Sequence, residues 1–376
     1  MAGLYIHIPF CNSKCAYCGF YSIPSLKLKE SFLAALRKDI TYRSDYLQGA
    51  GLNTVYFGGG TPSLLSSDEI AALLDSINHY FPIATDAEIT LEANPDTLSQ
   101  DYLAALRKIG INRLSIGIQS FFDNDLHYLN RRHDSKHARL CIDWAFNAGF
   151  DNISIDLIYG LPTSDVGQWN RNLDLFFQTG APHLSAYALT LEPNTILSKL
   201  VEQNKTPSPT EEAIIRDYET LTRRTAEHGF LHYEISNFAL PQKHSRHNVS
   251  YWNGTPYMGL GPSAHSYNGN SRQWNIANLQ QYIRLAGVSD AVFEKEMLTP
   301  EQHYDEYVMT SLRTSWGCDL KYMKRKLGPS FSDYCQQKAE KLIQQGRLSH
   351  TREFLHLTDM QMLFADGIAQ ELFWEE

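Results

Sequence analysis

The sequence predicts an α/β fold: a partial (βα)6 barrel with an appended, mainly helical, winged-helix-like C-terminal domain. Six β-rich apolar runs alternate with helical patterns over the first half of the chain, and this alternation is typical of a parallel sheet with helices outside. A closed barrel needs eight such units, so six favour a partial or open barrel, with a doubly wound sheet as the alternative. After residue 290 the pattern changes to helices followed by a short hairpin, as in a winged helix.

The expected strands are short runs in which apolar and polar residues alternate or apolar residues dominate. They cover residues 4–8, 54–57, 88–92, 113–119, 152–158 and 183–190, and residues 233–238 offer a further strand. The helices expected between them cover residues 27–47, 68–80, 100–109, 135–148 and 167–178. Ser66 and Glu69 match a capping box at the start of the second helix, which supports that boundary.

The second half of the chain divides into three parts. A long helix is expected over residues 211–228, and a loop-rich segment dense in His, Asn, aromatic and Gly residues follows it. Further helices are expected over residues 300–315, 320–327 and 333–345, then a hairpin to residue 357 and a final helix. We therefore predict a barrel at 1–240, a connecting segment at 241–290 and a C-terminal domain at 291–376.

Charge and composition exclude several classes of function. The 376 residues carry 33 Lys and Arg against 42 Asp and Glu, a net charge of −9. Because phosphate contacts dominate affinity for nucleic acids, this acidic chain is a poor candidate for a nucleic-acid partner. No run of 18 apolar residues and no signal peptide are present, so we expect a cytoplasmic protein, with any membrane association arising through partners.

Three of the six cysteines are clustered near the start of the chain. Cys11, Cys15 and Cys18 fall within eight residues, whereas Cys141, Cys318 and Cys335 are isolated and are interpreted as small buried residues. Structural zinc usually has four ligands, and a disulfide scaffold is shorter and exported. Three thiolates without a fourth suit an iron–sulfur cluster with one open iron, with zinc or no metal as the alternatives.

Polar side chains on the inner face of the predicted sheet mark a second candidate site. Strand alternation places Glu92 and Gln119 near the carboxyl ends of their strands and Asp156 slightly deeper, all on the inner face. Parallel sheets place active sites at that edge, and the alternative is a buried ion pair with Arg131. The run Gly58–Gly60 follows strand two and lets a ligand approach the backbone, unless it forms only a tight turn.

The segments 246–252 and 259–266 contain two histidines and an aromatic pair. These side chains could hold a flat aromatic ligand, or the segments could cover the barrel mouth, which their composition favours.

Taken together, these motifs resemble those of the radical S-adenosylmethionine (SAM) proteins, in the branch of oxygen-independent coproporphyrinogen III oxidases and HemW-type heme chaperones. The resemblance covers about residues 4–267 and rests on Cys-x3-Cys-x2-Cys and on other motifs in the same order. They are His-Ile-Pro-Phe (7–10), Gly-Gly-Gly-Thr-Pro (58–62), Leu-Glu-Ala-Asn-Pro (91–95), Ser-Ile-Gly-Ile-Gln-Ser-Phe (115–121), Ile-Asp-Leu-Ile-Tyr-Gly-Leu-Pro (155–162) and His-Asn-x2-Tyr-Trp (247–252).

The resemblance implies a [4Fe-4S] cluster on Cys11, Cys15 and Cys18, with SAM on its fourth iron. It also implies SAM contacts by motif match, and the residues concerned are Tyr5, Tyr17, Gly59, Gly60, Thr61 and Glu92. Gln119, Arg131 and Asp156 match positions that contact a second SAM in the oxidase, and whether a second SAM binds here stays open. We expect a branched side chain at Gly60 to block SAM while sparing the cluster.

Within this branch, the residues favour the heme chaperones. The oxidases carry a fourth cysteine where this chain has Phe20, and a long N-terminal extension ahead of the first cysteine. The motif from His247 to Trp252 is characteristic of the chaperones. We expect His247 to ligate or orient heme, with Tyr251 and Trp252 packing on the macrocycle and His265 as a second candidate ligand.

The expected partners are heme or a porphyrin, heme-accepting apoproteins and an electron donor for the cluster, and a homodimer is one open arrangement. Other readings of the chain are a coproporphyrinogen III oxidase, a radical SAM protein with another substrate, and a cluster-free binding module.

Overall fold

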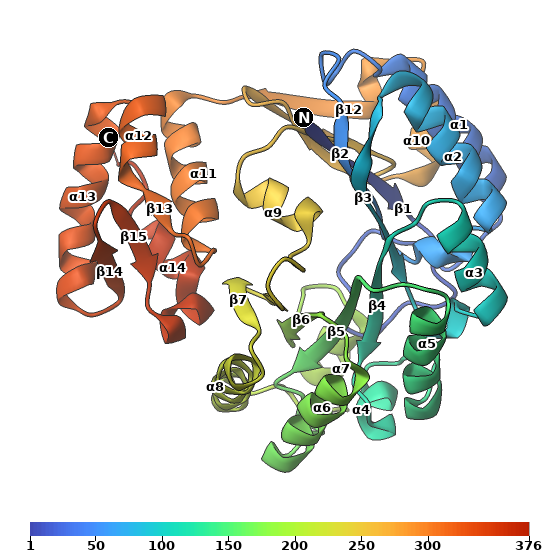
Figure 1. Ribbon diagram of the computed structural model, residues 1–376, viewed down its shortest axis with the longest axis horizontal. Coiled ribbons are helices and arrows are strands. Elements are labelled where there is room, and N and C mark those ends of the chain that lie inside the picture. The colour runs from blue at the N-terminus through green and yellow to red at the C-terminus, as the bar shows by residue number, and fades with distance from the viewer. Residues whose placement is uncertain (376) are drawn as a thin grey trace.

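The computed structural model describes residues 1–375, and their larger sheet has twelve strands in the order β12-β11-β10-β9-β1-β2-β3-β4-β5-β6-β8-β7 (Figure 1). Six consecutive strands pair in parallel, each followed by at least one helix: β1 (Ala2–Ile8), β2 (Leu52–Gly59), β3 (Ile83–Ala93), β4 (Arg113–Gln119), β5 (Ile153–Tyr159) and β6 (His183–Ala188). These units confirm the α/β class and the six-unit partial barrel.

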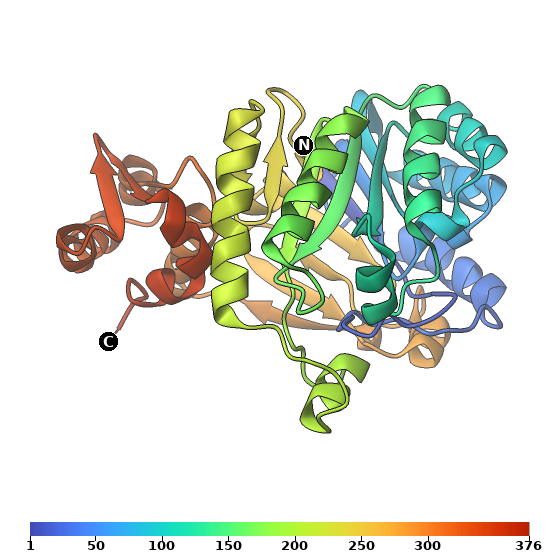
Figure 2. The same cartoon turned by 90° about the horizontal axis from the view of Figure 1, so that it is seen from below.

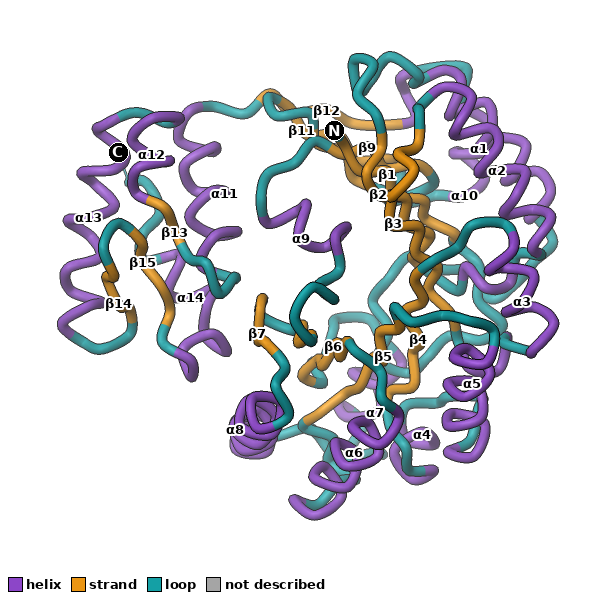
Figure 3. The backbone as a smooth tube through the Cα atoms, in the orientation of Figure 1, coloured by secondary structure: helices purple, strands orange, loops and turns teal. Residues whose placement is uncertain are grey.

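Helices cover the outer face of the parallel strands, as Figure 3 shows for α1, α2, α3, α5 and α6. The helices of this part are α1 (Lys29–Tyr42), α2 (Ser67–Tyr80), α3 (Gln100–Lys108), α4 (Asp123–Tyr128), α5 (Ser135–Asn147), α6 (Val166–Thr179), α7 (Ile196–Glu202), α8 (Glu211–Glu227) and α10 (Leu279–Leu285). The capping box at the start of α2 is present, with Ser66 and Glu69 exchanging hydrogen bonds. The short helices α4, α7 and α10 were not predicted, since each is only about two turns long.

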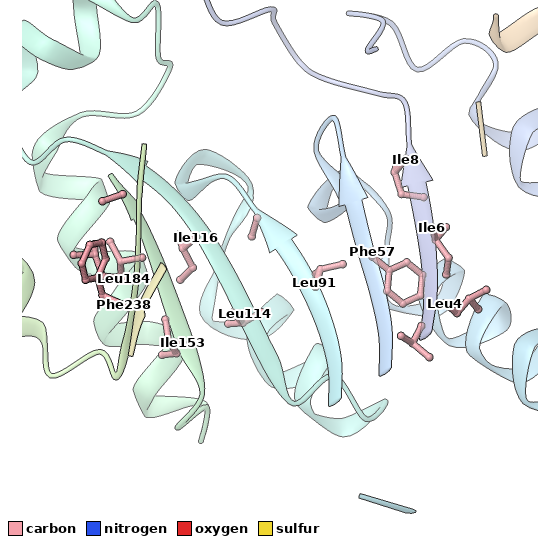
Figure 4. Packing of buried hydrophobic residues seen from close by; sticks show 14 of the residues in the cluster. Leu4, Ile6, Ile8, Phe57, Leu91, Leu114, Ile116, Ile153, Leu184 and Phe238 are labelled. Carbon is pink, nitrogen blue, oxygen red and sulfur yellow. The ribbon is translucent and has the colours of Figure 1, made fainter. Parts of the chain in front are cut away.

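Alternation along the strands separates an apolar outer layer from a polar inner face. Leu4, Ile6 and Ile8 of β1 are fully buried in one cluster with Phe57 and Leu91 (Figure 4). Successive side chains of a strand point to opposite faces, so Tyr5 and His7 lie on the other side of β1. The candidate site is built on that inner face.

Six further strands extend the sheet beyond the barrel units: β7 (Leu231–Glu234), β8 (Asn237–Ala239), β9 (Tyr257–Leu260), β10 (His265–Tyr267), β11 (Ser271–Asn275) and β12 (Phe293–Met297). Residues 233–238, expected to offer one strand, contribute to two strands, β7 and β8, which pair antiparallel. β9 pairs in parallel with β1, so β1 lies between β2 and β9 in the interior of the sheet.

The expectation that residues 246–252 form a loop is wrong. They form the helix α9 (Arg246–Trp252), and residues 259–266 belong partly to β9 and β10. Ser245 caps α9 by accepting the N–H of Asn248 at 3.3 Å. The carboxylate of Glu88 on β3 accepts the N–H groups of Arg246 and His247 at 3.1 and 3.0 Å. A negative charge at a helix N-terminus is stabilising, so a distant residue favours helix where local composition suggested loop.

The C-terminal domain lies at one end of the molecule in both Figure 1 and Figure 2. Its elements are α11 (Pro300–Leu312), β13 (Cys318–Asp319), α12 (Leu320–Lys326), α13 (Pro329–Gln344), β14 (Leu348–Thr351), β15 (Phe354–Leu357) and α14 (Ala365–Gln370). The three small strands form their own sheet, which confirms a mainly helical domain with a hairpin. β12, which leads into it, pairs with β11 of the large sheet. Among residues 1–375 no helix has the length and apolar character to cross a membrane.

Candidate functional site

The loop that carries the clustered cysteines leaves the carboxyl end of β1 and returns to α1. Cys11, Cys15 and Cys18 are all partly accessible, whereas the other three cysteines are buried. The N–H of Cys11 donates to the carbonyl of Ile23 at 3.1 Å, and the N–H of Cys18 donates to the carbonyl of Cys15 at 3.3 Å. These bonds hold the three thiols on one closed loop at the edge of the parallel strands.

Arg131 is the main positive charge against this loop. Its Nη1 donates to Cys15 Sγ at 3.2 Å, and its Nη2 donates to Asn94 Oδ1 at 2.8 Å and to the carbonyl of Gly117 at 2.6 Å. A Cβ on Gly117 would lie 3.3 Å from that Nη2, so the glycine leaves the guanidinium its space. The guanidinium thus links a sulfur atom of the cysteine loop to β4 and to the residue that follows β3.

Glu92 is held at the end of β3 by two donors. Tyr56 Oη donates to its Oε1 at 2.8 Å, and the N–H of Gly59 donates to its Oε2 at 3.1 Å. Burial, to which the negative charge of Asp156 adds, raises the pKa of Glu92 to about 7 in spite of these bonds. The arrangement is a carboxylate poised to accept hydrogen bonds from a ligand at the strand ends.

The glycine run packs against both the cysteine loop and the Glu92 side chain. A Cβ on Gly58 would lie 2.8 Å from Tyr5 and 3.0 Å from Glu92 Oε1, whereas a Cβ on Gly60 would lie 2.6 Å from the carbonyl of Phe10 and 3.1 Å from Cys11 Sγ. Thr61 Oγ1 donates to the same Sγ at 3.5 Å. Gly60 therefore packs directly against the cysteine loop, so a branched residue there would displace this loop, contrary to the expectation that such a change spares it.

Asp156 and Gln119 lie on the inner face as the alternation predicts, but within residues 1–375 Asp156 forms no ion pair with Arg131. The Oδ1 of Asp156 accepts from Ser115 Oγ at 3.0 Å and from Ser154 Oγ at 3.3 Å. Gln119 has a positive φ of 67° at an irregularity in the pairing of β4 with β5. Tyr17 sits on the cysteine loop and packs against the small apolar cluster that contains Ala16.

His247 lies inside the protein, with both ring nitrogens engaged. Its Nδ1 lies 2.8 Å from Thr54 Oγ1 and its Nε2 lies 2.8 Å from Tyr251 Oη, while the ring stacks on Tyr56 with centroids 4.9 Å apart. Burial, with the positive charge of Arg113, lowers the pKa of His247 to about 3, so the imidazole is neutral. In this conformation the side chain positions Tyr251 and offers no free nitrogen to a ligand.

A cavity of about 940 Å³ opens between the inner face and the C-terminal domain. Its walls come from β1, the cysteine loop, α9, β10, β11, α11 and α12, and they include Tyr251, Trp252 and His265, three of the side chains expected to contact heme. Much of the lining is aromatic, contributed by Tyr5, Phe20, Tyr21, Tyr257, Tyr267, Tyr307, Trp316, Tyr322 and Phe354. Large ligand pockets in proteins reach about 1,000 Å³, so the cavity is big enough for a large flat molecule.

Sequence reasoning did not single out several residues that build this site. Asn94 belongs to the motif Leu-Glu-Ala-Asn-Pro (91–95). Its place in that motif was the one sign in the sequence that it could be part of the site, where it accepts a hydrogen bond from Arg131. Glu88 and Arg113 form a buried ion pair at 3.9 Å beside His247. His303 lines the cavity from α11, and no local pattern marks it.

Comparison with known proteins agrees with this geometry. Residues 5–176 match the family model described as the radical SAM superfamily, and residues 298–364 match the HemN C-terminal domain. The protein "Heme chaperone HemW" of Mycobacterium tuberculosis (strain CDC 1551 / Oshkosh) is 34% identical over 375 residues, covering 98% of this chain and 94% of that protein. A protein of the same name from Bacillus subtilis (strain 168) is 32% identical over 372 residues, covering 98% of each chain.

Among solved structures, the coproporphyrinogen III oxidase HemN of Escherichia coli superimposes with a TM-score of 0.86 at 24% identity. The match covers 99% of this chain and 90% of that one. At this identity it establishes the shared fold, including the appended helical domain. With relatives above 30% identity over nearly their whole length, the chain belongs to the HemW family of the radical SAM superfamily.

Proposed function

We propose that this chain is a heme chaperone, which binds heme in the aromatic cavity and passes it to apoproteins in the cytoplasm. The observation that carries the proposal is the cavity itself, where rings from the barrel and from the C-terminal domain surround one space of about 940 Å³. Apolar faces of aromatic side chains suit a flat macrocycle, because they bury large area with defined geometry. The names of the HemW relatives support the same cargo.

The cysteine loop fits a [4Fe-4S] cluster, which the radical SAM family implies. Cys11, Cys15 and Cys18 would hold three irons, and the donors from Thr61 and Arg131 would stabilise the negative sulfur atoms. With SAM on the open iron, such a cluster supplies one-electron chemistry at the SAM sulfonium. An external electron donor would reduce the cluster.

SAM would lie against the strand ends beside this loop. Gly58–Gly60 let the ligand approach the backbone, and Glu92 offers a carboxylate to an ammonium or a hydroxyl group. Arg131 and Asp156, whose family positions contact a second SAM, already make the hydrogen bonds described above. A second SAM is therefore not part of this proposal.

Phe20 separates the chaperone proposal from the oxidase alternative. The oxidases carry a cysteine at the matching position, whereas here a phenyl ring, 68% exposed, lines the cavity two residues after Cys18. An exposed apolar ring at this place suits contact with cargo and cannot replace a thiol in chemistry. The oxidase alternative keeps its support from the HemN fold alone.

One anaerobic experiment tests both functions. The cluster is reconstituted, and the protein is then offered heme and coproporphyrinogen III separately, with SAM and a reductant present. We expect stable heme retention with a Soret band and no vinyl-group formation. Decarboxylation of coproporphyrinogen III without heme retention would assign the chain to the oxidases.

A further inference from the structure

Two histidines that face the cavity have free ring nitrogens, and they come from separate domains. His265 lies on β10 of the large sheet and His303 lies on α11 of the C-terminal domain, and both line the cavity. Within residues 1–375 neither imidazole makes a hydrogen bond. In contrast, both ring nitrogens of His247 and both of His7 are engaged in hydrogen bonds.

We propose that His265 and His303 are the two axial ligands of the iron when heme occupies this cavity. The inference rests on the proposed heme-binding function and adds to it the ligand pair, which differs from the His247 assignment favoured by the sequence motif. Heme iron is commonly held by the imidazole of histidine. An iron ligand needs a nitrogen atom that no other group occupies, and both of these cavity-lining imidazoles have one.

An ion pair across the cavity brings the two histidines to facing walls. Arg272 Nη2 on β11 lies 2.6 Å from Glu306 Oε1 on α11, which ties the sheet to the C-terminal domain. In the ladder of β10 with β11, Tyr267 is opposite Arg272 and His265 is opposite Trp274. His265 and Arg272 are therefore diagonal neighbours on one face, with Cα atoms about 7–8 Å apart.

On the other wall, His303 precedes Glu306 by three residues in α11. Residues spaced in this way share a helix face, with Cβ atoms about 5–6 Å apart. His265 is thus a neighbour of Arg272 and His303 is a neighbour of Glu306, the two residues of the ion pair. The sheet therefore contributes one imidazole to the cavity lining and the C-terminal domain contributes the other.

The surrounding charges and rings suit the rest of the macrocycle. Arg272 is 39% exposed at its side chain, so its guanidinium has N–H groups left for a carboxylate of the cargo. Tyr267 and Tyr307 line the cavity beside the two histidines and supply flat apolar area. Burial, with the positive charge of Arg272, lowers the pKa of His265, which favours the neutral imidazole, the form that binds a metal.

The test is a titration of the full chain with ferric heme, read by absorbance and by electron paramagnetic resonance. The variants are His265→Ala, His303→Ala and His303→Met, and His79→Ala on the exposed end of α2 is the control. We expect a six-coordinate low-spin spectrum in the wild type. Each Ala variant should lose that signature and bind heme at least about tenfold more weakly, since it lacks one iron ligand.

The remaining variants make the result specific. His303→Met should keep the heme six-coordinate but shift its spectrum and raise its reduction potential, because methionine is a softer ligand. His79→Ala should match the wild type, and circular dichroism confirms that each variant is folded. An unchanged wild-type spectrum in either Ala variant would overturn the ligand pair. A wild type that binds no heme at all would instead remove the proposed function on which the pair rests.

Discussion

The Nε2 atom of His247 lies 2.8 Å from the hydroxyl of Tyr251, one turn further along α9. Thr54 on β2 holds the other ring nitrogen at 2.8 Å. The imidazole thus bridges the barrel and a side chain that lines the cavity. This relationship makes His247 a structural link between the sheet and the wall of the proposed heme site.

Replacing His247 with Ala should therefore lower stability more than it alters iron coordination. The change leaves a cavity and the Thr54 and Tyr251 hydroxyls without their partner, at a cost of about 2–4 kcal/mol. Thermal unfolding of the variant measures the first effect, and the spectrum of bound heme measures the second. A stable variant that loses an axial-ligand signature would instead make His247 an iron ligand.

Replacing Cys11, Cys15 and Cys18 together with Ala should abolish the cluster. A reconstituted wild type should absorb broadly near ~400 nm through sulfur-to-iron charge transfer, and reduction should bleach the band. The triple variant should show neither the band nor bound iron. Cys141→Ala, at a buried helical position, is the control and should keep both. Iron retained by the triple variant would refute the ligand assignment.

The two glycines Gly58 and Gly60 should separate SAM binding from cluster binding. In Gly58→Ala the new methyl group presses on Tyr5, Tyr56 and Glu92, so SAM affinity should fall while the cluster absorbance stays. In Gly60→Ala it presses on the Phe10 carbonyl and Cys11 Sγ, so iron content should fall as well. Iron analysis and SAM titration of the matched pair measure both effects. Equal iron contents in the two variants would contradict this division.

Phe20→Ala should weaken heme binding without changing stability. The ring is 68% exposed, so its removal costs the fold little, yet it lines the cavity. Loss of part of a phenyl contact area corresponds to about 1–1.5 kcal/mol, or roughly tenfold in affinity. Val288→Ala, at a side chain 66% exposed outside the cavity lining, should bind heme as the wild type does. Unchanged affinity in Phe20→Ala would remove this ring from the site.

Because the Glu234 carboxyl is buried, its ionisation should lower the free energy of unfolding as the pH rises. Its side chain is 1% exposed, and burial raises its pKa to about 7, although hydrogen bonds from Asn237 and Ser236 and the charge of Arg313 oppose the shift. The native state then binds more protons than the unfolded state between pH 4.5 and 7, so stability falls over that window.

Glu234→Gln removes this titration. The variant should match the wild type near pH 4.5 and exceed it at pH 8 by up to about 3 kcal/mol, read as a Tm difference that grows with pH. Glu340→Gln, at an exposed position on α13, is the control and should show no such growth. A constant Tm difference for Glu234→Gln across the range would contradict the buried carboxyl.

Local patterns predicted the barrel well, because each strand shows its own alternation. The strand expected at residues 113–119 is β4 residue for residue. The helix α9 could not be found in this way, since its stabilising partner Glu88 lies far away on β3. The candidate site likewise combines residues that are close in sequence with residues that are far apart. Three cysteines close in sequence were visible as a group, whereas Phe20 and His303 line one cavity only because the C-terminal domain folds back against the barrel.

The position of β1 between β2 and β9 sets an order of events during synthesis. One edge of β1 is covered once residues 52–59 have emerged, but its other edge waits for Tyr257 to pair with Gly3. At about 5–20 residues per second this wait lasts roughly 10–40 s. During that time β1 is an open edge strand, and the cysteine loop that follows it stands at the rim of an unfinished sheet. Cys11, Cys15 and Cys18 are therefore made, and stay accessible, before the cavity beside them exists.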